Sequence, residues 1–150
     1  MPPCGDVQQD VCVCLVQILG NWGASHSEFV VGGNEAGMKL GDEVRGADAV
    51  VWRHSDLGPR TGGFRRVPPI LAVEVAGQDE GEVELRTKAN WYFNHGVSVV
   101  WVVLPDERSV LVLRPEGEGR YSGTQMLPPN PKLPGLEPNV AEFFRQLDSH

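Results

Sequence analysis

The sequence predicts a single α/β (α+β) domain, in which a mixed β-sheet is flanked by helices. Its 150 residues are enough for one domain with a sizeable core. Residues 70–76 and 98–104 are short apolar runs, as expected of strands buried on both faces. Residues 82–95 lie between these runs and have helical spacing, and Gly96 ends the segment. Strands that alternate with helices in this way favour a sheet covered by helices.

The remaining elements complete this order along the chain. We expect a first helix over residues 6–20, and a hairpin of residues 28–31 and 38–40 around Gly32-Gly33-Asn34. We further expect strands at 47–52 and 109–114 and a closing helix at 140–147. The segments between them include an extended loop at 55–67 and a proline-rich stretch at 128–138. The chain 1–150 then forms one domain, with a short helical segment at 1–25 and an extended segment plus helix at 128–150.

Composition excludes several classes of protein. The net charge of −7 argues against a protein that coats nucleic acid nonspecifically. The longest apolar runs are too short to span a bilayer, and the N-terminus lacks the layout of a signal peptide, so we expect a cytoplasmic protein with no membrane partner. Cys4, Cys12 and Cys14 match neither a disulfide framework nor a zinc site.

Two acidic residues interrupt apolar strands. Glu74 lies within Ile70–Ala76 and shares a face with Ala72 by strand alternation, while Asp48 shares a face with Val50 and Trp52. A buried carboxylate is costly unless a cation or metal compensates it, and Mg²⁺ needs few protein carboxylates. The alternatives are that Asp48 caps a turn and that Glu74 pairs with an arginine.

A lysine on the following helix points to the same site. Leu85, Lys88, Ala89 and Tyr92 form one helical stripe, so the apolar members should carry Lys88 towards the sheet and Glu74. Alternatively, Lys88 extends to solvent.

The order and spacing of several motifs resemble the Uma2 family. These motifs are Gly-Ala-Asp48-Ala-Val-Val, Val73-Glu74-Val75, Gln78-Asp79, Lys88, Tyr92, Gly96-Val97, Trp101-Val102-Val103, Leu104-Pro105 and Leu133-Pro134-Gly135-Leu136. The resemblance spans residues 26–147 and implies a restriction-endonuclease-like fold of the PD-(D/E)XK nuclease superfamily. Departures from the family pattern are Ala47 in place of proline, Ala76-Gly77-Gln78-Asp79 in place of Ser-Pro-Ser-Asp, and an N-terminal segment that is short for the family.

The resemblance implies a Mg²⁺- or Mn²⁺-dependent endonuclease that hydrolyses phosphodiester bonds of DNA. Asp48, Glu74 and the carbonyl of Val75 would be metal ligands. Lys88 would be a catalytic lysine that has moved from position 76 to the helix. Tyr92 would position Lys88 or contact the phosphate, or would simply be a core aromatic.

Other predictions concern binding surfaces. Arg60, Arg65 and Arg66 lie in a glycine-rich loop and are candidates for phosphate contacts, or form a solvated basic loop. The resemblance also implies a homodimer, with 98–113, Trp91 and Trp101 as a candidate interface. Two further hypotheses stay open: a catalytically degenerate domain that serves as a binding or assembly module, and a metal-dependent enzyme with a substrate other than nucleic acid.

Overall fold

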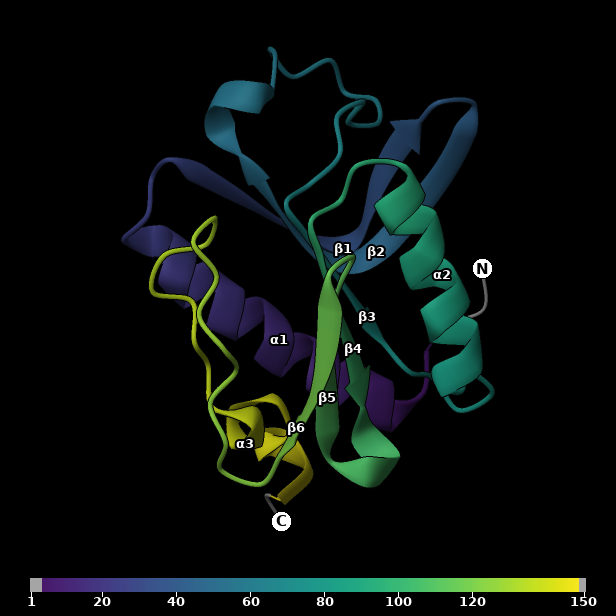
Figure 1. The fold of residues 1–150 in the computed structure, drawn as a ribbon, viewed down its shortest axis with the longest axis vertical. Helices are drawn as coiled ribbons and strands as arrows, with labels where there is room; N and C mark the ends of the chain where they lie inside the picture. Colours follow the sequence, from purple (N-terminus) through teal and green to yellow (C-terminus); the bar gives the residue numbers. More distant parts are fainter. Residues whose placement is uncertain (1–3, 149–150) are drawn as a thin grey trace.

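The computed structural model describes residues 4–148, which form a six-stranded sheet and its covering helices (Figure 1). The elements in chain order are α1 (Asp6–Ala24), β1 (Phe29–Leu40), β2 (Glu43–Arg53), β3 (Leu71–Val75), α2 (Glu82–Asn94), β4 (Val99–Leu104), β5 (Ser109–Arg114), β6 (Gly117–Ser122) and α3 (Val140–Phe143). Short 3₁₀ turns occupy His54–Asp56, Pro105–Glu107 and Arg145–Asp148.

The sheet is mixed, as predicted, and its strands follow the chain order from β1 to β6. Among the strands of residues 4–148, only β3 and β4 pair in parallel, with Leu71 opposite Val99, while the other neighbouring strands are antiparallel. A parallel pair requires a crossover connection, and α2 supplies it.

The sheet divides the core into two halves, each covered by helices. Figure 1 shows α1 and α3 on one side of the sheet and α2 on the other. Leu71, Val73 and Val75 of β3 belong to the half under α1 and α3, whereas Ala72 belongs to the half under α2. By alternation, Glu74 also faces α2. The predicted face for this carboxylate is therefore confirmed.

The predicted hairpin at residues 28–40 is wrong, because β1 continues through it as one strand. The chain turns later, at Gly41 and Asp42, before β2 begins. Gly33 pairs with Ala49 and Ala36 pairs with Ala47, so the two residues between them, Asn34 and Glu35, form a bulge. Both have positive φ, 58° and 54°. A bulge uses the same glycine and asparagine residues as a tight turn, which explains the wrong prediction.

Several other boundaries differ from the sequence prediction. Strand β6 was not predicted, since its residues are polar and its side chains are mostly exposed at an edge of the sheet. Helix α1 extends beyond residue 20 to Ala24, and the closing helix is a short α3 followed by a 3₁₀ turn. The three cysteines are free thiols.

Most of the candidate dimer interface lies in the core, so that part of the prediction is wrong. Trp101 is only 3% exposed and its ring packs against Phe143, 5.8 Å between centroids. Trp91 is partly covered by the guanidinium of Arg45. The apolar strands β4 and β5 lie in the core because helices cover both faces of the sheet.

None of the helices within residues 4–148 combines the length and the apolar character needed to cross a membrane.

Candidate active site

Glu74 is the centre of a polar cluster between β3 and α2. Its side chain is almost completely buried, with 3% of the residue exposed. Lys88 Nζ donates to Glu74 Oε1 at 3.1 Å, and the Tyr92 hydroxyl donates to Glu74 Oε2 at 3.2 Å. Lys88 and Tyr92 lie one helical turn apart, and Leu85 and Ala89 of the same stripe are buried, as predicted. The sequence-predicted contact between Lys88 and Glu74 is present.

Asp48 lies across the strand pair from Glu74. Ala49 pairs with Val73, which places Asp48 beside Glu74 on the α2 face. Asp48 Oδ2 accepts a hydrogen bond of 2.7 Å from the backbone N–H of Val75. The carboxylate is therefore held by the β3 backbone rather than by a turn after Gly46.

Glu80 joins the cluster, although sequence reasoning missed it. Lys88 Nζ donates to Glu80 Oε2 at 2.7 Å, which is shorter than its bond to Glu74. Asp79 is exposed, and the N-cap of α2 is Gly81, whose N–H donates to Glu84. The Lys88 side chain stays 43% exposed, so it reaches the buried acid and solvent at once.

Gln8 is the second residue that sequence reasoning missed. Its side-chain Nε2 donates to the carbonyl oxygen of Val75 at 3.0 Å. Helix α1 thus contacts the same backbone carbonyl that the family resemblance implies as a metal ligand. The first helix thus reaches the site with an amide.

The cluster holds more negative than positive charge, and the pKa values reflect this. Burial raises the pKa of Glu74 to about 7, and the nearby charge of Asp48 adds to the increase, against the opposing effect of Lys88 and Tyr92. Burial also raises the pKa of Asp48, although the Val75 N–H opposes it. The pKa of Tyr92 is raised by burial and by Glu74, so its hydroxyl stays protonated and donates.

Lys88 remains charged in this setting. Burial lowers its pKa, but the hydrogen bond to Glu80 and the charge of Glu74 outweigh burial, so the net pKa lies above its ordinary value. One ammonium therefore compensates the carboxylates of Asp48, Glu74 and Glu80.

The donor set is compatible with a hard divalent cation. Among residues 4–148, no group of three histidine, cysteine, aspartate or glutamate side chains is arranged to hold a metal ion. Mg²⁺, however, commonly uses one or two carboxylates and keeps several waters. Asp48 and Glu74, with the Val75 carbonyl, match that requirement, and their raised pKa values show that a further positive charge would be favourable there.

A cavity of about 500 Å³ adjoins the cluster. It lies between the start of α1 and the segment after β3, and Gln8, Ala76, Gly77 and Glu80 are among its lining residues. Since Gln8 and Glu80 contact Val75 and Lys88, the cavity provides space directly beside the candidate site.

The three predicted phosphate-binding arginines lie in a different place. Arg60, Arg65 and Arg66 line a second cavity, of about 400 Å³, formed by the loop 57–67. The Arg65 guanidinium lies over the Trp52 ring, 5.6 Å from its centroid. The loop arginines thus form a surface of their own.

Comparison with known proteins agrees with the fold. Residues 1–144 match the Uma2 family, which is described as "putative restriction endonuclease". The chain also resembles the crystal structure of a "putative nuclease belonging to DUF820" from Anabaena variabilis, with a TM-score of 0.82 and 18% identity over 97% of this chain and 84% of that one. At that identity the likeness shows a common fold. No curated protein matches the sequence. The chain belongs to the Uma2 family.

Proposed function

We propose that this protein is a Mg²⁺- or Mn²⁺-dependent nuclease that hydrolyses phosphodiester bonds of DNA. The observation that carries the proposal is the buried Glu74 carboxylate, which lies beside Asp48 and receives hydrogen bonds from Lys88 and Tyr92. Buried acids next to a lysine are costly for stability, so their presence favours a catalytic use. The family description agrees with a nuclease.

Each residue has a role that follows from its contacts. Asp48, Glu74 and the Val75 carbonyl would hold the metal ion, which supplies Lewis-acid stabilisation of phosphate charge and lowers the pKa of a bound water. The Val75 N–H orients the Asp48 carboxylate, and the Gln8 amide holds the Val75 carbonyl.

Lys88 and Tyr92 act on either side of Glu74. The half-exposed ammonium of Lys88 can orient an attacking water or stabilise charge that develops on the phosphate. Tyr92 is 2% exposed and donates to Glu74, so its role is to position that carboxylate, which leaves phosphate contact to Lys88.

Cleavage assays test this function. Wild-type protein should cleave supercoiled plasmid or single-stranded DNA with Mg²⁺ or Mn²⁺, and should not cleave in EDTA. Lys88→Met and Glu74→Gln should each lower the rate by about 100-fold or more. Glu116→Gln, an exposed acid in the turn after β5, is the matched control and should cleave like wild type. Equal rates for Glu74→Gln and wild type would exclude the assigned site.

One observation favours a second candidate, a binding or assembly module that has lost catalysis. Each proposed metal ligand already has a protein partner: Asp48 has the Val75 N–H, Glu74 has Lys88 and Tyr92, and the Val75 carbonyl has Gln8. If the protein is such a module, wild type should show no metal-dependent cleavage. Metal should then leave the melting temperatures of both wild type and Glu74→Gln unchanged.

The homodimer remains a proposal supported by the family resemblance. Sedimentation velocity on the purified protein tests it, and the interface must exclude Trp101, because that side chain is buried in the core.

A further inference from the structure

Unpaired basic side chains gather around the loop 57–67. Within residues 4–148, most arginines outside this loop pair with carboxylates, as Arg53 does with Asp56 and Arg108 with Asp148. Arg60 and Arg66 are exposed and have no carboxylate within ion-pair distance in this part of the chain. The protein carries a net charge of −7, so a surface of uncompensated cations is an exception that needs a reason.

The loop is anchored to the β1–β2 hairpin, which brings a further lysine beside it. The N–H of Lys39 donates to the Arg65 carbonyl at 2.8 Å, and the N–H of Arg65 donates to the Gly37 carbonyl at 3.3 Å. Thr61 Oγ1 accepts from the N–H of Gly63 within the loop. These hydrogen bonds give the loop a defined shape and place Lys39 next to Arg65.

An exposed aromatic residue, Phe64, lies between Arg60 and Arg66 in the loop sequence and lines the same cavity. Phe64 is 53% exposed, although large apolar side chains are normally buried. Its ring packs against Gly37 so closely that a β-carbon there would lie 2.6 Å from the ring. Gly37 therefore makes room for the ring, while half of Phe64 remains accessible beside the 400 Å³ cavity that Phe64, Arg60 and Arg66 help to line.

An exposed ring flanked by unpaired cations matches the chemistry of single-stranded nucleic acid. Bases of a single strand stack on aromatic side chains while its phosphates follow a basic surface. Bases inside a duplex are already stacked on each other, so a duplex would leave Phe64 without its partner. We propose that the surface formed by Lys39, Arg60, Phe64 and Arg66 binds a single-stranded segment of DNA, with a base on Phe64 and phosphates on the cations.

This inference rests on the proposed function, because it names the form of its DNA substrate. The Arg65 guanidinium lies over the ring of Trp52, whose indole N–H donates to the carbonyl of Val67. Trp52 lies on the same face of β2 as Asp48. The two residues are four positions apart, which is about 13 Å along a strand. The loop surface is thus a few nucleotides from the candidate active site.

Fluorescence anisotropy in EDTA, where cleavage is absent, tests the proposal with a labelled single-stranded DNA of about 12 nucleotides. Wild type should bind this strand more tightly than the corresponding duplex. Phe64→Ala should weaken single-strand binding by about tenfold. The double variant Arg60→Gln/Arg66→Gln should bind with a weaker salt dependence. The slope of the logarithm of the binding constant against the logarithm of salt concentration should become shallower by about 0.7 for each arginine removed. Circular dichroism checks that each variant is folded.

Arg108→Gln is the control, because it removes one arginine that is paired with Asp148 and lies outside the loop 57–67. It should leave affinity unchanged. Equal affinity of wild type and Phe64→Ala, or tighter binding of duplex, would overturn the single-strand surface even if the protein cleaves DNA. Conversely, loop-dependent binding by a protein that cleaves no DNA would support this surface and contradict the nuclease proposal.

Discussion

Glu74 is a carboxylate whose surroundings compensate its charge only in part. Lys88 donates to one of its oxygens and Tyr92 to the other, yet burial still raises its pKa from 4.5 to about 7. That difference corresponds to about 3 kcal/mol between its charged and neutral forms in the folded protein. The folded state therefore pays a cost to keep Glu74 ionised, and an additional cation would remove it.

The pH dependence of stability should reveal this cost. Because the folded pKa lies above the unfolded value, Glu74 contributes stability at low pH that is lost as pH rises from about 4.5 to about 7. In EDTA, the unfolding free energy of Glu74→Gln relative to wild type should therefore increase across that window, by up to about 3 kcal/mol. Urea denaturation at a series of pH values measures it. A difference that stays constant with pH would contradict the account.

Lys88 should matter for stability mainly when Glu74 is ionised. Lys88→Met keeps most of the aliphatic stem but leaves Glu74 without its ammonium partner. We expect a loss of about 2 kcal/mol at pH 8, less than for a fully buried pair because Lys88 is partly exposed, and a smaller loss at pH 5. Lys132→Met, which removes an exposed lysine bonded to Ser98, is the control. Equal losses for the two variants would contradict this role.

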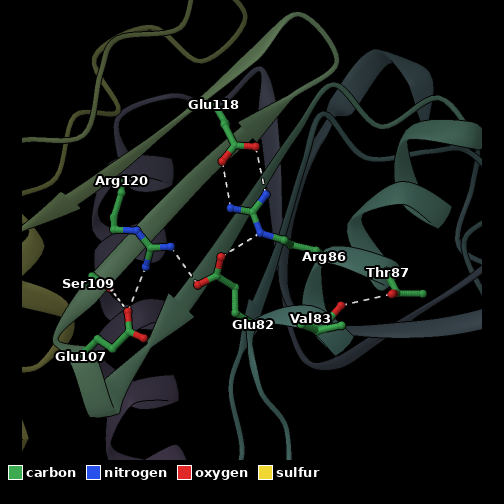
Figure 2. A network of polar contacts seen from close by, with 8 residues as sticks. All are labelled: Glu82, Val83, Arg86, Thr87, Glu107, Ser109, Glu118 and Arg120. Atoms are coloured by element: carbon green, nitrogen blue, oxygen red, sulfur yellow. Dashed lines mark hydrogen bonds and ion pairs between the residues drawn. The ribbon is translucent and has the colours of Figure 1, made fainter.

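At the level of elements, an ionic network ties α2 to the β5–β6 side of the sheet (Figure 2). Arg86 donates to Glu118 through both terminal nitrogens, at 2.9 and 2.8 Å, and to Glu82 through Nε at 2.8 Å. Arg120 in turn bridges Glu82 and Glu107. Since α2 also carries Lys88 and Tyr92, the network helps to hold these two side chains over Glu74.

Disrupting the network should loosen the helix. Arg86→Met should lower the melting temperature by about 2–4 °C at low salt, because it removes a bidentate pair from a connected set. The effect should shrink in about 1 M salt, where charges are screened within about 3 Å. Arg108→Met, which loses one isolated ion pair, should have the smaller effect. Identical melting curves for Arg86→Met and wild type would show that packing alone positions α2.

The bulge in β1 is the second element with a functional position, because it lies opposite Asp48. Glu35 has a φ of 54°, a conformation that β-branched residues rarely adopt. Glu35→Val should therefore destabilise the protein by about 1–2 kcal/mol, whereas Glu35→Gly should be neutral or slightly stabilising. Chemical denaturation compares the two. Equal effects would mean that the strand can take up the bulge elsewhere.

For the whole molecule, residues close in sequence determined what could be predicted. Alternation within β3 placed Glu74 towards α2, and the stripe of α2 placed Lys88 towards Glu74, because both patterns are local. The contacts of Gln8 with Val75 and of Glu80 with Lys88 depend on how α1 and the segment before α2 pack. No sequence period reports such packing, so these two residues were missed.

Wrong predictions have the same physical origin. Gly32-Gly33-Asn34 suits both a hairpin turn and a bulge, and only the pairing of β1 with β2 selects the bulge. Trp91 and Trp101 are large apolar residues whether they lie in an interface or in a core, and only the packing of the sheet between its helices places Trp101 inside.

The central claim is that Asp48 and Glu74 form a metal site, and thermal melting with Mg²⁺, Mn²⁺ or EDTA tests it most directly. An ion that binds only the folded state raises the melting temperature once the ion concentration exceeds the dissociation constant of its site. Wild type should melt at a higher temperature in either metal than in EDTA, and Asp48→Asn should melt at the same temperature in all three. No metal-dependent increase in wild type, or an equal increase in Asp48→Asn, would contradict the claim.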